Sequence, residues 1–155
     1  MFDFKFNLTA IKILLVLIIA AFFTPFFFVS CGEGDAGASF SGFEISTGKY
    51  IGEYRQEGTP FGFALVVLPA GLLILSSLTR RSAAIYSVCR YLFFIAPIFD
   101  VFAVFIVWRA FGAAASQKLE AIPVTIGLKP GFALYIALNA ALFVLAALNY
   151  FKGQK

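Results

Sequence analysis

Histidine is absent from this 155-residue chain, and only two cysteines are present. The missing imidazole removes the commonest transition-metal ligand and the commonest axial ligand of haem. Charged residues are also sparse, at 13% of the chain, whereas an average soluble domain has roughly 25%. We therefore expect no metal site and no cofactor, and the composition argues against a water-soluble fold.

The chain also lacks the patterns that carry enzyme chemistry. It has no nucleophile placed beside a base, no glycine-rich phosphate loop and no metal cluster. Its net charge of +4 comes from basic residues dispersed at the ends of apolar segments, without a basic stripe and interleaved aromatics. The sequence therefore predicts neither an enzyme nor a nucleic-acid-binding protein.

Hydrophobic residues are abundant, at 61% of the chain. They concentrate in four stretches, at residues 13–29, 61–78, 91–107 and 132–151. A helix rises ~1.5 Å per residue and the hydrocarbon core of a bilayer is ~30 Å thick, so each stretch is long enough to cross it. The sequence predicts one all-α membrane domain over residues 1–155, a bundle of four transmembrane helices surrounded by lipid.

The distribution of charge predicts the orientation of these helices. Seven of the twelve basic residues lie before the first stretch, between the second and third, or after the fourth, and there they face only Asp3. The loops at 30–60 and 109–130 hold the other five, together with six acidic residues. By the positive-inside rule both termini are cytoplasmic and these two loops lie outside.

Cys31 has two interpretations. Lys5 and Lys12, the apolar run and Cys31 are typical of a secretory signal with a lipidated cysteine after the cleavage site. The run is longer than a signal core of 7 to 15 residues, however, and this favours an uncleaved first span with Cys31 as a free or intermolecular thiol. A bond to Cys89 is excluded, because bonded cysteines have Cα atoms within ~7 Å and these lie at opposite ends of spans.

The two outer loops contain strand-like patterns. Phe43 and Ile45 alternate with polar residues within 40–48, and Val124-Thr125-Ile126 is β-prone and bounded by proline and glycine. We expect these two segments to pair and to form a small β-lid on the helix ends. The helix formers after Trp108 predict that the third helix continues beyond the membrane.

Two resemblances follow from these segments. The runs Pro25-Phe26-Phe27-Phe28-Val29-Ser30-Cys31, Ser41-Gly42-Phe43-Glu44 and Gly48 resemble the first helix end and first loop of small, uncharacterised bacterial multi-span membrane proteins. That resemblance implies a bacterial inner-membrane setting and no catalytic activity. The long third helix and strand-rich loop are similar to claudin-type four-span proteins in architecture only, because the Trp and paired cysteines of the claudin first loop are missing.

Asp100 is the most informative residue within the apolar stretches. It lies ten residues beyond Arg90, which places it near the bilayer midplane, where an aspartate costs ~2.5 to 3.5 kcal/mol on insertion scales. Asn139 falls at a similar depth, so a protonated Asp100 that donates to Asn139 would join the third and fourth stretches. A proton or ion relay and a contact with another subunit are the alternatives.

Prolines interrupt two of the predicted helices. Pro69 and Pro97 each remove a helix hydrogen bond and leave one carbonyl free, that of Leu65 and that of Phe93. We expect kinks at both, which shape the bundle or form a gate beside Asp100. Pro130 suits the first turn of the last helix.

Small residues in the last stretch point to a packing surface. Ala133, Ala137 and Ala141 recur at four-residue spacing, and Asn139 lies 200° from Ala137 around a helix. If Asn139 points inward, the alanine stripe faces lipid, a protein partner or a second copy of the chain. We therefore expect a structural or accessory subunit of a bacterial inner-membrane assembly. The alternative is a small transporter or oligomeric channel that uses Asp100 as a proton or ion site.

Overall fold

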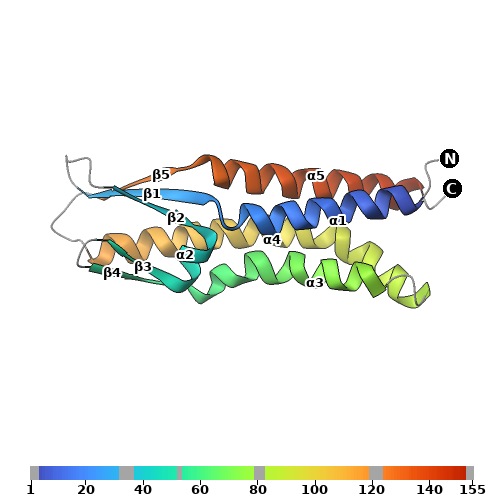
Figure 1. The fold of residues 1–155 in the computed structure, drawn as a ribbon, viewed down its shortest axis with the longest axis horizontal. Helices are drawn as coiled ribbons and strands as arrows, with labels where there is room; N and C mark the ends of the chain where they lie inside the picture. The colour runs from blue at the N-terminus through green and yellow to red at the C-terminus, as the bar shows by residue number, and fades with distance from the viewer. Residues whose placement is uncertain (1–3, 32–36, 52–53, 79–82, 119–123, 153–155) are drawn as a thin grey trace.

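The computed structural model describes residues 4–31, 37–51, 54–78, 83–118 and 124–152. Four long helices lie side by side along its long axis, and the strands lie at one end, as Figure 1 shows. The chain termini lie together at the opposite end. The long helices are α1 (Phe4–Ala21), α3 (Ala64–Leu78), α4 (Ala83–Lys118) and α5 (Pro130–Lys152).

Three of these segments are long and apolar enough to cross a membrane. They are Pro60–Leu78, Val88–Ala113 and Pro130–Asn149, with mean hydropathies of 2.3, 2.2 and 2.2. The apolar part of α1, Leu8–Ala21, is shorter. Length and composition thus support a multi-pass membrane protein with a small β-structure.

The first predicted span, 13–29, is wrong at its carboxyl end. Helix α1 ends at Ala21, and strand β1 (Pro25–Cys31) follows after a short turn. The Thr24 hydroxyl donates to the Ala21 carbonyl at 2.6 Å, which satisfies an acceptor at the helix end. Pro25 cannot continue a helix and favours an extended residue before it, and the aromatic residues that follow suit a strand.

Strand β1 is the centre of a three-stranded antiparallel sheet with the order β2-β1-β5. Strand β2 (Gly37–Ser41) pairs with β1 through registers such as Phe28 with Ser39, and β5 (Val124–Leu128) pairs through Val29 with Ile126. The predicted strand at 124–126 is therefore confirmed. Its partner is β1, and not the 40–48 segment that the sequence pattern indicated.

The prediction of a strand within residues 40–48 is also wrong, because the centre of this segment is the helix α2 (Gly42–Thr47). Ser41 is the N-cap: its hydroxyl accepts from the Glu44 amide at 3.2 Å, and Glu44 Oε2 accepts from the Ser41 amide at 2.9 Å. This capping box needs Ser and Glu at a spacing of three, and it overrides the alternation of polar and apolar residues. Helix α2 ends at Gly48, whose φ of 85° favours glycine.

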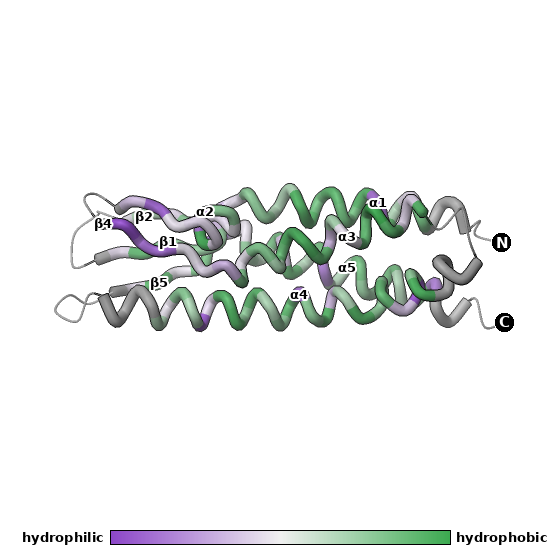
Figure 2. The backbone as a smooth tube through the Cα atoms, turned by 90° about the horizontal axis from the view of Figure 1, so that it is seen from below, coloured by the Kyte–Doolittle hydropathy of each residue, from purple (hydrophilic) through white to green (hydrophobic). Residues whose placement is uncertain are grey.

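The remaining strands form a hairpin of β3 (Gly48–Ile51) and β4 (Tyr54–Glu57). A 3-10 turn, η1 (Pro60–Phe63), then leads into α3. Figure 2 shows that hydrophilic residues gather at this end of the molecule while the long helices are predominantly hydrophobic. We call residues 25–31, 37–51, 54–57 and 124–128 the head, and the four long helices the body.

Helix α4 connects the head and the body. Its 36 residues span about 54 Å at 1.5 Å per residue, well beyond the ~30 Å of a hydrocarbon core. The prediction that this helix continues past Trp108 is confirmed. Helix α5 begins at Pro130, also as expected, because proline is well suited to the first turn of a helix.

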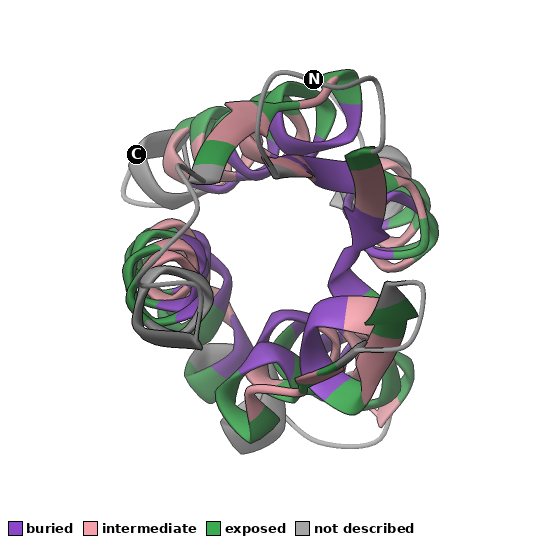
Figure 3. Ribbon diagram, turned by 90° about the vertical axis from the view of Figure 1, so that its left-hand side faces the viewer, coloured by how far each residue is buried: buried purple, intermediate pink, exposed green. Residues whose placement is uncertain are grey.

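Buried residues face the axis between the long helices, and exposed ones face outward, as the end-on view in Figure 3 shows. The body core contains Leu15, Ile18, Leu65, Val104 and Leu142. Helix α1 contacts α3 and α5, and α4 contacts α3 and α5. Each long helix therefore has two helical neighbours and one outward face, and many large apolar side chains lie on these outward faces.

Candidate functional site: a buried polar cluster in the body

Three buried polar side chains gather where α3, α4 and α5 meet. Tyr135 and Asn139 lie four residues apart on α5 and therefore on the same face of that helix, and Asp100 comes from α4. Asp100 is 3% exposed and Asn139 1%, and Tyr135 is fully buried. We call these three residues the polar cluster.

The Tyr135 hydroxyl joins all three helices. It lies 2.8 Å from the Leu65 carbonyl oxygen of α3 and 2.7 Å from Asp100 Oδ2 of α4. The Leu65 carbonyl is available because Pro69, four residues later, has no amide hydrogen to donate to it. The proline that interrupts α3 thus provides the acceptor that binds α5 to α3.

Hydrogen counting determines how these two bonds can coexist. A phenol has one hydrogen, and the Leu65 carbonyl oxygen can only accept. If Tyr135 donates to Leu65, the contact with Asp100 is a full hydrogen bond only when the carboxyl carries a proton and donates to the phenol oxygen. A neutral Asp100 therefore completes a chain of two bonds from α4 through α5 to α3.

Asn139 occupies the other side of this arrangement. Its Nδ2 donates to the Tyr135 carbonyl at 3.1 Å, within its own helix. The Asn139 amide is close enough to influence the Asp100 carboxyl electrostatically. The geometry between these two described side chains is not that of a hydrogen bond. Asp100 Oδ1 and Asn139 Oδ1 are both buried without a partner among the described residues. Two hydrogen-bond acceptors of the polar cluster therefore lack a donor among the described residues.

A group of aromatic side chains, the aromatic core, lies between the polar cluster and the strands of the head. The Tyr135 ring lies 5.3 Å from Phe26 of β1, and Phe27 of β1 stacks on Phe111 of α4 at 5.9 Å. Phe40 of β2 contacts Phe111 edge to face at 5.1 Å. Centroid separations of 4.5 to 7 Å are those of favourable aromatic pairs. These rings, together with Phe132, connect the strands to the long helices.

The sequence predicts a hydrogen bond between Asp100 and Asn139. The structure places both in one cluster and gives the Asp100 bond to Tyr135. Tyr135 was missed because a tyrosine near a helix start is typical of the membrane interface. Its spacing of four from Asn139 was the available signal, since that spacing puts two polar groups on one helix face.

The other predicted residues lie as follows. Pro69 and Pro97 are both buried within their helices. Ala133, Ala137 and Ala141 are exposed on α5, on the side away from Asn139. Cys31 ends β1, and its side chain lies outside the described part of the chain, whereas Cys89 is buried and its thiol lies 3.8 Å from the Leu75 carbonyl oxygen.

A second polar network lies in the head, around the capping box of α2. Lys49 Nζ lies 2.6 Å from Glu44 Oε1 and donates to the Ser39 carbonyl at 3.0 Å. Burial alone would raise the pKa of Glu44, but the hydrogen bonds from Lys49 and Ser41 and the charge of Lys49 outweigh it, so this pKa lies below its ordinary value of 4.5. Glu44 therefore stays ionised and holds β2 against β3.

The residues of the bacterial resemblance lie at this junction. Pro25 is opposite Ser41 in the sheet register, and a Cβ on Gly42 would lie 2.5 Å from the Phe22 ring. Ser41 and Glu44 form the capping box, and Gly48 ends α2. Each has a role in chain geometry, so the motif describes how the head joins the body.

Among the described residues no three His, Cys, Asp or Glu side chains are grouped so that they could hold a metal ion. The arrangement instead offers hydrogen-bond acceptors inside an apolar body. No family model, no curated protein and no solved structure matches this chain.

Proposed function

We propose that this chain is a non-catalytic, four-span protein of a bacterial inner membrane that acts as a structural or accessory subunit of a membrane assembly. In this proposal α1 is the fourth membrane helix. Its 18 residues span about 27 Å, close to the ~30 Å of a hydrocarbon core, and it lies beside α3 and α5. Lys5 and Lys12 lie in its first half, and a long lysine side chain reaches the membrane surface from such a position. The head then lies outside, beyond the ends of α1, α3 and α5 and beside the last part of α4.

The orientation follows from charge. The beginnings of α1 and α4 and the ends of α3 and α5 lie at one end of the molecule (Figure 1). The first halves of α1 and α4 contain Lys5, Lys12 and Arg90, and Lys152 ends α5. In the sequence, three further basic residues follow α3 or α5, which makes seven of the twelve. The positive-inside rule assigns this end to the cytoplasm. The bacterial setting rests on the resemblance of the first loop.

The bridge made by Tyr135 is the observation that carries the structural role. The hydroxyl of a single α5 residue binds both α3 and α4, so the Asp100 carboxyl serves the packing of the protein's own helices. The exposed stripe Ala133, Ala137 and Ala141 lies on the other side of α5, where small residues allow close approach of a further helix. We propose this stripe as the contact with the partner or with a second copy.

Association tests this proposal. Ala137→Leu places a bulky side chain in the middle of the stripe, and we expect the complex solubilised in mild detergent to become smaller in size-exclusion chromatography with light scattering. Ala20→Leu is the matched control, because it makes the same exchange at an exposed position of α1. An unchanged size for Ala137→Leu would remove the stripe from the proposal.

The polar cluster favours a second candidate, a small transporter or oligomeric channel with Asp100 as its proton or ion site. The favouring observation is that Asp100 Oδ1 and Asn139 Oδ1 are buried acceptors without partners among the described residues. We expect Asp100→Asn to abolish a pH-dependent flux in proteoliposomes while assembly is kept, because an amide still bonds Tyr135 but cannot release a proton. No flux with the parent protein would exclude this function.

The proposal also requires an intact amino-terminal segment. Lipidation of Cys31 after cleavage would remove α1 and all of β1 except its last residue, and β1 is the middle strand of the sheet. We therefore expect an intact mass that includes residues 1 to 30 and no acyl chains. A mass without them would favour the lipid-anchor alternative.

A further inference from the structure

A groove of about 240 Å³ lies between α4 and α5. Its walls are formed by Pro97, Ile98, Val101 and Phe102 of α4 and by Asn139, Ala140 and Phe143 of α5. Ile98 and Phe102, at 41% and 64% exposure, form part of its rim, so the groove opens on the outer side of the body. In the membrane setting proposed above, it opens to the hydrocarbon of the bilayer.

Among the described residues that line the groove, Asn139 is the only polar one, and it is 1% exposed. Its Nδ2 already donates to the Tyr135 carbonyl, whereas its Oδ1 has no partner among the described residues. A buried acceptor of this kind is unfavourable unless a donor reaches it. The exposed surface of the groove is thus apolar, and one unsatisfied acceptor, Asn139 Oδ1, lies buried in its wall.

We propose that this groove binds a membrane-soluble molecule with an apolar chain and a single hydroxyl, whose O–H donates to Asn139 Oδ1. The volume is below the ~300 Å³ at which sites for drug-sized ligands begin, so it holds one chain segment and not a whole lipid. The apolar walls contact the chain, and the amide selects the hydroxyl.

The depth of Asn139 explains why the donor is neutral. Asn139 lies nine residues after the start of α5, about 14 Å along the helix. A charged ammonium or a phosphorylated headgroup is held at the membrane surface, because charge is unfavourable within hydrocarbon. A hydroxyl on an otherwise apolar molecule reaches this depth and still donates one hydrogen bond.

Photolabelling of the full-length protein in nanodiscs tests the site. The probes are a diazirine-bearing dodecanol and its methyl ether, which differ only in the donor. We expect both to label groove residues, and the alcohol to label them at roughly two- to tenfold lower concentration, the factor that one net hydrogen bond contributes. Peptide mapping by mass spectrometry locates the label.

Two variants separate the amide from the groove. Asn139→Leu is expected to remove the advantage of the alcohol. Ala140→Phe keeps Asn139 and fills the groove from an exposed position, so it is expected to reduce labelling by both probes. Val144→Phe is the control, because Val144 is 56% exposed on the same helix and does not line the groove.

Competition identifies the source of the hydroxyl. Displacement by dioleoylglycerol indicates a neutral lipid, displacement by unlabelled dodecanol alone indicates a free alcohol, and either result supports the proposal. Equal labelling by alcohol and ether in the parent protein overturns it. So does labelling outside the groove, or labelling that Ala140→Phe leaves unchanged.

Discussion

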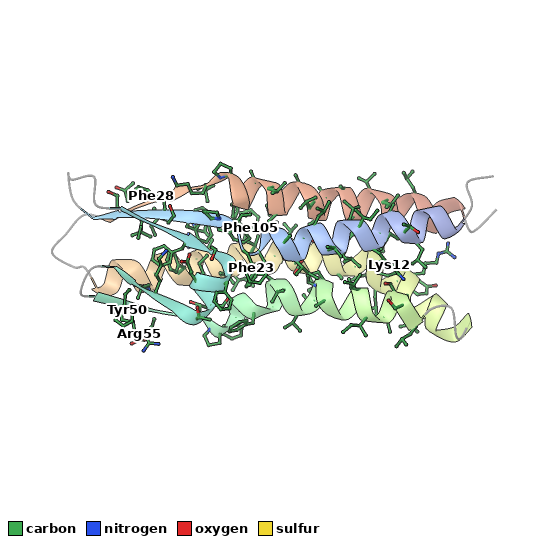
Figure 4. All side chains as sticks on the ribbon, viewed as in Figure 1. Lys12, Phe23, Phe28, Tyr50, Arg55 and Phe105 are labelled. Carbon is green, nitrogen blue, oxygen red and sulfur yellow. The ribbon has the colours of Figure 1, made fainter. Side chains whose placement is uncertain are left out.

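The polar network around Glu44 in the head and the polar cluster in the body have different surroundings. In the head, the Glu44 and Lys49 side chains are 32% and 36% exposed. In the body, no member of the polar cluster exceeds 3%. Figure 4 shows Tyr50 and Arg55 of the β3–β4 hairpin on the outside of the head, whereas the side chains of the body are mostly apolar.

The surroundings determine how much each polar network contributes to the stability of the fold. An exposed ion pair contributes about 0 to 1 kcal/mol, because water replaces the partner when one side is removed. In the body nothing replaces a lost partner, and an unsatisfied buried group costs about 1 to 3 kcal/mol. The polar cluster should therefore contribute more to the stability of the fold than the Glu44–Lys49 network, although it contains fewer charges.

The aromatic core between the head and the body should make the largest contribution to stability. Phe111 of α4 contacts both Phe27 and Phe40, so one side chain of the long helix holds two strands of the sheet. Loss of this ring removes apolar burial and leaves a cavity, and both effects destabilise the fold. Three substitutions test this order.

The largest effect is expected for Phe111→Ala. Deleting a buried phenylalanine side chain destabilises by about 3 to 5 kcal/mol, and here the head also loses two ring contacts with α4. The free energy of unfolding in detergent, followed by far-UV circular dichroism, measures it. Phe99→Ala is the control on the same helix, since Phe99 is 62% exposed, and an equal loss for both would contradict the assigned core.

An intermediate effect is expected for Tyr135→Phe. It keeps the ring in the aromatic core but removes both bonds of the bridge, so the Leu65 carbonyl and Asp100 Oδ2 each lose a partner. We expect a loss of about 1 to 3 kcal/mol in the same unfolding assay. Tyr50→Phe, at a position 66% exposed, should change the stability little. Equal stability of Tyr135→Phe and the parent would show that the bridge does not hold the helices.

The smallest effect is expected for Glu44→Gln. Glutamine can still form the capping box, so this change isolates the charge that pairs with Lys49, and we expect a loss of at most about 1 kcal/mol at pH 7. Because folding lowers the pKa of Glu44, its contribution is fully present above about pH 4.5, its ordinary value, and is lost as the pH falls through the folded pKa.

Thermal unfolding of Glu44→Gln and the parent between pH 7 and pH 3 checks this third prediction. The difference in melting temperature should narrow below about pH 4.5 and approach zero at the acid end. A difference that is independent of pH would assign the effect to the side-chain amide and not to the charge.

Particular residues show how far the sequence could predict the fold. The long apolar runs indicated the three segments from residue 60 onward, and Pro130 marked the start of α5. The predicted end of α1 is wrong because Phe26, Phe27 and Val29 are as hydrophobic as the helix before them, although they belong to β1. Pro25 was the local signal against that interpretation, since a helix rarely continues through it. Ser41 and Glu44 were the corresponding signal for α2.

The site was predicted only in part. Asp100 stands out in any apolar run, and the loss of a donor at Pro69 identified the Leu65 carbonyl as free. Neither signal, however, indicates which side chain fills the gap. That depends on the rotation of α5 about its axis and on its depth relative to α3 and α4, and these are properties of the packed helices.

The sequence alone indicates the apolar character of the long helices, the approximate extent of three of them and the presence of a carboxyl group, Asp100, within an apolar run. The hydrophobicity and the length of a segment depend only on residues that follow one another in the sequence, so both are known without the fold. Only the tertiary structure decided that β1 pairs with β5, that Tyr135 bridges Asp100 and Leu65, and that Asn139 faces a groove while the alanine stripe faces outward. These contacts join residues up to 101 positions apart, as Phe27 and Leu128 are, and their geometry exists only once the helices have packed.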